Sequence, residues 1–309
     1  MVEAALNEGA LNTSMVLTPA QIPVLIAAFN EKYPGINVTN NRPVTSVAGA
    51  KEVDEMMNQG QLAYDLVTFS DFTWAAKTSG EGKVVGPSGP ALQEGWDKSD
   101  FVNDVSVPIN ATPVVLSYNT DLVKEAPKSW DTLATPEYAG KTGVILQNGS
   151  EAVVALYDFF AQKVDPVYAQ TLAGLSPRIY QNTGATVQGV ASGEVAWANF
   201  GTAADIQTLQ QQGAPIAYTV PEEGTTAWTN YVSVFKDAKH KNAALLFLDF
   251  LMSSEGQTIL TQGGNSFSYI GVPGSFDVDP KAIRFPRPED GVQENRTAAI
   301  DQFKQLFGT

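Results

Sequence analysis

The residues best suited to chemistry are short polar clusters that follow apolar, strand-like runs. Thr13 and Ser14 end the first such run, and Ser70 and Asp71 follow the buried run 65–69. Loops after parallel strands, together with helix N-termini, present hydroxyl and free N–H groups to a polar or anionic ligand. The same residue types also cap ordinary helices. We therefore expect ligand contacts at these loops, with helix capping as the competing explanation.

A third cluster carries a positive charge. Arg42 stands near Ser46 in a loop that is expected to follow the second strand. A guanidinium group offers a planar fork of donors that matches a carboxylate or a phosphate. The competing explanation is a solvated loop. For Asp71, pairing with a ligand cation competes with capping of the helix that carries Trp74.

Each candidate in the second half of the chain is expected either directly after a strand or at the start of a helix. They are Ser150, Gly184, Ala185, Thr186, Asn199 and Phe200. Helix starts leave N–H groups without partners, and these groups bind anions. Ordinary caps and turns would explain the same residues.

Three further candidates lie near the expected crossings of the chain. Trp228 and Tyr231 offer a stacking wall or a face for a cation, although aromatic residues of this kind also fill cores. Asn110 lies inside a long β-rich segment, 107–118, which we interpret as a hinge.

Composition excludes several classes of function. The chain of 309 residues has no cysteine, and its single histidine, His240, lies in a Lys-rich loop where we expect it to be solvated. No Ser/His/Asp set, phosphate-binding loop or HExxH motif is present, so we expect no enzyme, no cofactor and no metal site. A net charge of −14 argues against nucleic acid and anionic membranes as partners.

No membrane insertion is expected either. The apolar run 243–252 is far shorter than the roughly 20 residues that span a bilayer. Residues 1–9 lack the features of a secretory signal, and we interpret the sequence as a mature, exported form with a replacement Met.

Strands and helices alternate along the whole chain, which predicts an α/β fold of two doubly wound lobes. Strands are expected at 11–15, 36–39, 65–69, 142–146, 195–198 and 230–235. Lobe 1 is expected to contain 1–110 and 225–309, and lobe 2 to contain 111–224. Hinges are expected near 108–113 and 220–226. The terminal helix 297–307 is expected to pack on lobe 1.

Several stretches resemble blocks of the type II periplasmic solute-binding proteins, in the branch that carries ferric iron, polyamines and organophosphonates. The stretch 29–36 reads FNEKYPGI, 117–122 reads SYNTDL, and 127–133 reads PKSWDTL. Similar blocks follow in order at 138–141, 190–194, 220–225 and 253–257. The resemblance implies a periplasmic or secreted, monomeric carrier that closes on a small-molecule ligand and delivers it to an ABC transporter permease in the inner membrane.

The resemblance also bears on the solute. The ferric carriers of this branch use two adjacent tyrosines near the position of Asn199 and Phe200, and no two tyrosines are adjacent here. We expect an anionic organic solute, such as a phosphonate, phosphate ester or carboxylate, held by hydroxyl loops and helix N-termini. The alternatives are a polyamine or other organic cation bound by Asp71, Glu223 and aromatic residues, an Fe(III) carrier, or a receptor subunit that signals by closure.

Overall fold

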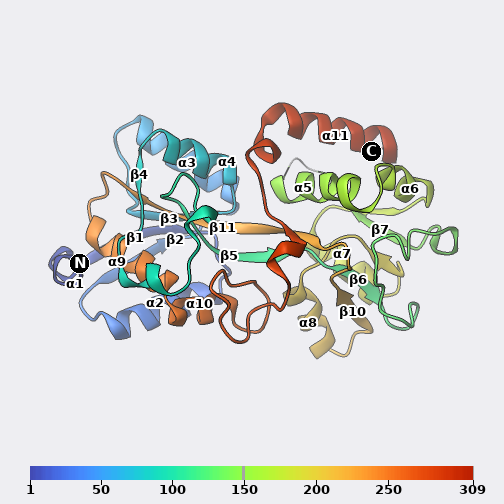
Figure 1. Cartoon of the computed structure of the whole chain (residues 1–309), viewed down its shortest axis with the longest axis horizontal. Coiled ribbons are helices and arrows are strands. Elements are labelled where there is room, and N and C mark those ends of the chain that lie inside the picture. Colours follow the sequence, from blue (N-terminus) through green and yellow to red (C-terminus); the bar gives the residue numbers. More distant parts are fainter. Residues whose placement is uncertain (148–149, 309) are drawn as a thin grey trace. The chain divides into compact units, whose positions relative to one another are not determined.

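The computed structural model describes residues 1–147 and 150–308 and divides the chain into two compact units (Figure 1). Unit 1 contains Met1–Ala111 and Thr229–Phe276, and unit 2 contains Thr112–Trp228 and Asp277–Thr309. The chain therefore passes between the units after Ala111, Trp228 and Phe276, where the sequence predicted two crossings. The first two crossings lie inside strands β5 (Val107–Pro113) and β11 (Thr225–Phe235).

The sheet of unit 1 has a parallel centre. Strand β1 (Ala10–Met15) pairs in parallel with β2 (Asn37–Asn41) and with β3 (Leu66–Phe69). Strand β11 then pairs antiparallel with β3 and with the short β4 (Val84–Val85), and β5 also pairs with β11. Because parallel strands need crossover connections, helices separate β1, β2 and β3 along the chain.

Helices cover the sheet of unit 1, and aromatic residues fill the space between. The helices are α1 (Val2–Glu8), α2 (Gln21–Lys32), α3 (Ser46–Asn58), α4 (Phe72–Gly80), α9 (Lys241–Met252) and α10 (Ser254–Thr261). Short 3-10 helices span Pro90–Gln93 and Lys98–Asp100. The ring of Phe29 meets the rings of Phe247 and Phe250 edge-on, with centroids 4.9 and 5.7 Å apart. The apolar face predicted for the helix after β1 is therefore buried against α9.

Unit 2 has a mixed sheet in the order β10-β6-β9-β7-β8. Its strands are β6 (Leu116–Asn119), β7 (Thr142–Ile145), β8 (Arg178–Tyr180), β9 (Trp197–Ala198) and β10 (Ile216–Thr219). Strand β7 is parallel to β8 and β9, whereas β6 is antiparallel to β9 and β10. The α/β class predicted from the sequence is confirmed, and the parallel part of this sheet is confined to three strands.

The helices of unit 2 come from two separate parts of the chain. They are α5 (Glu151–Phe159), a π-helix (Phe160–Val164), α6 (Tyr168–Gly174), α7 (Thr183–Ala191), α8 (Ala203–Gln211) and α11 (Gln293–Phe307). Short 3-10 helices span Pro136–Tyr138, Pro280–Ala282 and Pro288–Gly291, and β12 (Ile283–Arg284) pairs with β11. The core contains the fully buried rings of Trp130, Trp197, Phe159 and Phe160.

The prediction that the terminal helix packs on lobe 1 was wrong. Figure 1 shows α11 running alongside α5, and the segment from Asp277 onward belongs to unit 2. Phe303 is buried in the core of unit 2, with its ring edge-on to Tyr157 at 5.7 Å. The side chain of Arg296 also donates to the carboxylate of Glu151 at 2.8 Å. The helical spacing of Phe303 and Phe307 marks a buried face, but it does not say which unit supplies the matching surface.

The prediction that His240 is solvated was also wrong. His240 is buried, and its Nδ1 lies 2.8 Å from Oδ2 of Asp65. Its backbone N–H donates to Oδ1 of Asp65, and Oδ2 also accepts from the N–H of Asn12. The buried carboxylate therefore joins β1, the start of β3 and the start of α9. Its hydrogen bonds offset the cost of removing the charge from water.

Within residues 1–147 and 150–308, no helix has both the length and the apolar composition that a membrane span requires.

The C-terminal segment is tied to unit 2 by a buried ion cluster, which gives a stability prediction. The Arg284 guanidinium donates to both Asp290 oxygens, at 2.7 and 2.8 Å, and to Asp158 at 2.6 Å. Replacing Asp290 with Ala leaves a buried cation with one half-exposed partner, so we expect a loss of about 3 kcal/mol in the free energy of unfolding. Urea-induced unfolding followed by circular dichroism measures the loss.

The matched control is Glu55→Ala, which breaks the exposed pair between Lys51 and Glu55 on α3. Exposed pairs of this spacing contribute less than about 0.5 kcal/mol. Equal losses in the two variants would contradict the role given to Arg284.

Candidate functional site

The carboxyl ends of β1, β2 and β3 lie at one edge of the unit 1 sheet, because these strands are parallel. Arg42 follows β2 directly, and its Nε donates to the carbonyl of Leu17, two residues beyond β1, at 3.0 Å. The side chain is exposed, and no ion pair holds it in the described part of the chain. The edge therefore presents a cation that no carboxylate of unit 1 neutralises.

Two hydroxyl groups join the elements at the same edge. Ser46 is the first residue of α3, and Ser70 follows β3. The hydroxyl of Ser46 accepts from the backbone N–H of Ser70 and lies 2.9 Å from the hydroxyl of Ser70. Both residues are half-buried, so their remaining hydrogen-bonding capacity is open to a solute.

Asp71 caps a helix, as the competing explanation predicted. Its Oδ1 accepts from the N–H of Trp74 at 2.9 Å, at the N-cap of α4. Thr45 caps α3 in the same way, by accepting from the N–H of Ala48. The first turns of both helices are therefore partly satisfied by the chain itself.

Thr13 and Ser14 lie inside the strand that was expected at 11–15, so the expectation that they present their hydroxyls from a loop after that strand was wrong. Strand β1 continues to Met15, which pairs with Thr68 of β3, so both residues lie inside the sheet and are buried. The Thr13 hydroxyl lies 2.9 Å from the carbonyl of Thr39 and from Oδ1 of Asn40. The Ser14 hydroxyl has no hydrogen-bond partner among the described residues.

In unit 2, the start of α7 is capped by a residue that the sequence analysis missed. Oδ1 of Asn182 accepts from the N–H of Ala185, and its carbonyl accepts from the hydroxyl of Thr186, each at 2.9 Å. Thr186 is buried and Gly184 is exposed. An Asn directly before Thr183 is a strong capping signal, which could have placed this helix start.

Ser150 occupies the N-cap position of α5 and is exposed. Its carbonyl accepts from the N–H groups of Val153 and Val154 at 3.1 and 3.0 Å. The expected position at a helix start is therefore confirmed for this residue.

Asn199 and Phe200 follow β9 but are buried rather than open. Oδ1 of Asn199 accepts from the N–H of Ile145 at 3.1 Å, which ties the residue to β7. The ring of Phe200 stacks on Trp228, with centroids 6.1 Å apart and planes 16° apart. Trp228 is half-buried, so the pair leaves part of one aromatic surface accessible.

The remaining two candidates are built into unit 1. Tyr231 is buried, and its ring meets Phe72 edge-on at 5.6 Å. Asn110 is buried, accepts from the side chain of Asn230 at 3.0 Å and donates to Ser266 at 3.3 Å. These contacts are those of core residues.

In the part of the chain that the structure describes, no three His, Asp or Glu side chains gather as a metal site would require.

Comparison with known families identifies the chain. Residues 13–258 match the model of the bacterial extracellular solute-binding proteins. This chain is a member of that family. The resemblance of its sequence blocks to periplasmic solute-binding proteins is thereby confirmed.

Curated proteins are also similar to this chain, at low sequence identity. The putrescine-binding periplasmic protein PotF of Escherichia coli is 27% identical in an alignment of length 265 that covers 74% of this chain and 70% of PotF. An uncharacterized protein of Haemophilus influenzae is 29% identical in an alignment of length 194 that covers 59% of this chain. The matched region spans only 56% of the length of that protein.

Solved structures share the fold. The periplasmic binding protein AfuA of Actinobacillus pleuropneumoniae, with fructose-6-phosphate bound, has a TM-score of 0.73 at 20% identity, covering 97% of this chain and 99% of AfuA. Iron-bound HitA of Pseudomonas aeruginosa has a TM-score of 0.69 at 19% identity, covering 96% and 99%. The two proteins bind different ligands and are at most 20% identical to this chain, so these likenesses show the fold alone.

The contrast between Ser14 and Thr186 gives a second prediction. Ser14→Ala removes a buried hydroxyl without a partner, so the melting temperature stays the same or rises. Thr186→Ala removes the hydrogen bond to the carbonyl of Asn182 and lowers the free energy of unfolding by about 1 kcal/mol. Thermal unfolding of both variants against the parent measures the difference. A loss in Ser14→Ala as large as in Thr186→Ala would mean that the Ser14 hydroxyl has a partner.

Proposed function

We propose that this protein is the solute-binding component of an ABC importer and that its solute is a small organic anion, such as a phosphonate, phosphate ester or carboxylate. The family supports the first part. One observation supports the second. Arg42 is exposed, has no ion pair with any described residue, and lies at the strand edge that also carries Ser46 and Ser70.

The chemistry of this edge suits an anion. A guanidinium binds carboxylate or phosphate through two parallel, charge-assisted hydrogen bonds. The N-terminus of α3, a helix of 13 residues, adds a partial positive charge close to Ser46. The net charge of −14 opposes an anion only at long range, because salt screens exposed charges beyond about 8 Å.

The carrier cycle follows from the same proposal. We expect a monomer outside the inner membrane that takes up its solute and closes on it. Solute binding then raises the population of a closed form by its greater affinity for that form. The closed form delivers the solute to a permease. Co-purification with a membrane permease separates this role from that of a receptor subunit that signals by closure.

A polyamine or other organic cation is the second candidate. It is supported by the half-exposed ring of Trp228 stacked on Phe200, since indole faces attract cations. PotF and the SpuD protein of Pseudomonas aeruginosa, both similar to this chain, are named as putrescine-binding. The carboxylates expected for a cation are partly engaged, because Oδ1 of Asp71 caps α4 and Oε1 of Glu223 accepts from the Ser129 hydroxyl. Oε2 of Glu223 is buried and has no hydrogen-bond partner among the described residues.

A panel of ligands separates these candidates. Thermal unfolding is measured with methylphosphonate, glycerol phosphate, succinate, putrescine, spermidine and Fe(III)-citrate. A ligand that binds only the native state raises the melting temperature. We expect a rise with at least one organic anion, and no rise with Fe(III)-citrate beyond that produced by citrate alone, because no adjacent tyrosines are present. A rise with polyamines alone would reject the anion.

Arg42→Gln is the sharpest test of the anion site. The change removes a charge-assisted contact, so we expect at least about a tenfold weaker affinity for the anion by isothermal titration calorimetry. Lys51→Gln is the matched control, because Lys51 is an exposed cation on α3 in an ion pair with Glu55. An Arg42→Gln variant that binds as tightly as Lys51→Gln would contradict the site.

Trp228→Ala tests the second candidate. If the solute is a polyamine, removal of the half-exposed ring should weaken spermidine binding by about fivefold or more. Arg42→Gln should then leave spermidine binding unchanged or improved. Calorimetric titration of both variants with spermidine gives the two values, and an unaffected Trp228→Ala variant would exclude the aromatic pair as a cation site.

A further inference from the structure

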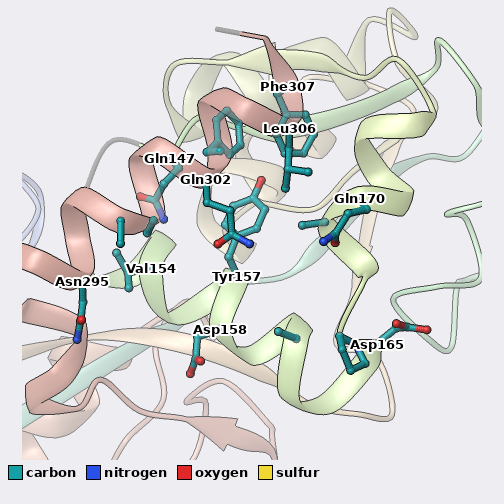
Figure 2. A pocket seen from close by; sticks show the side chains of 16 residues that line it. Gln147, Val154, Tyr157, Asp158, Asp165, Gln170, Asn295, Gln302, Leu306 and Phe307 are labelled. Carbon is teal, nitrogen blue, oxygen red and sulfur yellow. The ribbon is translucent and has the colours of Figure 1, made fainter.

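A separate pocket of about 290 Å³ lies within unit 2, among α5, the π-helix Phe160–Val164, α6 and α11 (Figure 2). None of the candidate solute-binding residues lines it. Its volume is at the lower end for ligand pockets, which measure about 300–1,000 Å³. It is therefore large enough for a small organic molecule.

Aromatic rings form one wall of this pocket. The rings of Phe303 and Phe307 stack with centroids 4.3 Å and planes 26° apart, and Tyr157 meets Phe303 edge-on. Val154 and Leu306 extend the apolar surface. Burial raises the pKa of the Tyr157 hydroxyl, which therefore stays neutral and donates to the carbonyl of Ile145. Such a wall suits a flat, uncharged ring.

Two carboxamides face this wall from different helices. In Figure 2 the side chains of Gln302, on α11, and Gln170, on α6, reach into the pocket from opposite sides. Neither side chain has a hydrogen bond to the described part of the chain, and both residues are exposed. Each carboxamide offers a donor and an acceptor. A ligand with its own donor and acceptor side by side would match them.

The charges at the rim argue against an anion. Asp158 and Asp165 line the pocket, and no lysine or arginine is among its described lining residues. The Asp158 carboxylate is already paired with Arg284, and Asp165 accepts from the N–H of Val167. An anionic ligand would meet the Asp165 carboxylate, which has no ion pair in the described part of the chain, whereas a neutral ligand meets no such repulsion.

The backbone beside the pocket is unusual as well. The N–H of Asp165 donates to the carbonyl of Phe160 at 3.0 Å, which is the i→i+5 bond of a π-helix. Ala161, in this segment, lines the pocket. Short π segments occur frequently at functional sites in helical proteins.

We propose that this pocket binds a small, uncharged aromatic molecule that carries a carboxamide or an equivalent donor–acceptor edge, as a lactam or a nucleobase does. The aromatic wall takes the ring, and Gln170 and Gln302 take the polar edge. This second ligand differs in charge from the anionic solute proposed for unit 1.

Benzamide and benzoate test the proposal, because they have the same shape and differ in charge. The full chain, labelled with ¹⁵N, is titrated with each compound, and amide chemical shifts are followed. We expect saturable benzamide binding with shifts on α6 and α11, and benzoate binding at least about tenfold weaker. Equal affinities for the two compounds, or shifts elsewhere in the chain, would overturn the proposal.

Substitutions in the pocket test whether benzamide binds to the residues named above. Gln302→Leu should weaken benzamide binding about tenfold, and Ala169→Leu should abolish it by filling the pocket. Gln305→Leu is the matched control, since Gln305 is exposed on the same helix and does not line the pocket. Benzamide affinities of Gln302→Leu and Ala169→Leu equal to that of Gln305→Leu would sink the assignment.

The Arg42→Gln variant distinguishes a failure of this proposal from a failure of the proposed anion site. This variant should bind benzamide like the parent protein, whatever happens to the binding of the anion in unit 1.

Discussion

The parallel hydrogen bonding of β1 with β2 and β3 is the constraint on which the candidate site of unit 1 depends. Because the three strands point the same way, the residues that follow them meet at one edge. Ser70 is 24 residues from Ser46 in the sequence, yet it meets Ser46 and Arg42 at that edge. The Asp65 carboxylate, just before β3, joins β1, β3 and α9 through hydrogen bonds to Asn12 and His240.

Polar side chains that already hydrogen-bond to backbone groups of the protein are less available to a solute than those that do not. Asp71, Thr45 and Asn182 each accept from an N–H at the start of a helix, so their oxygens are partly used within the fold. Thr186 similarly donates to a helix carbonyl. Arg42 differs, since one nitrogen bonds to the backbone while the rest of the exposed guanidinium has no ion pair in the described chain. A charged group that the protein leaves accessible is the better indication of a binding role.

The C-terminal segment gives unit 2 a feature that the sheet alone does not provide. Its ion cluster around Arg284 and the stacked rings of Phe303 and Phe307 attach α11 to the helices α5 and α6. Packing of a late helix against two earlier ones leaves the pocket lined by Tyr157, Gln170 and Gln302. The pocket thus exists only because distant parts of the chain come together in one unit.

The sequence by itself indicated the α/β class, the positions of β1, β2, β3, β7 and β9, and the resemblance to the solute-binding family, but it did not predict helix α1 or strand β8. Periodicity, caps and motif blocks are local, and local patterns fix local structure. It also placed Arg42 and Ser70 correctly, directly after strands, whereas Ser46 begins helix α3 instead of lying in the loop. Only the tertiary structure decided which residues are buried and which unit the terminal helix joins. Thr13 and Ser14 are buried because β1 extends to pair with β3, and His240 is buried because Asp65 lies opposite it. The terminal helix joined unit 2 because its aromatic stripe matches α5, and an apolar stripe carries no information about which partner will cover it.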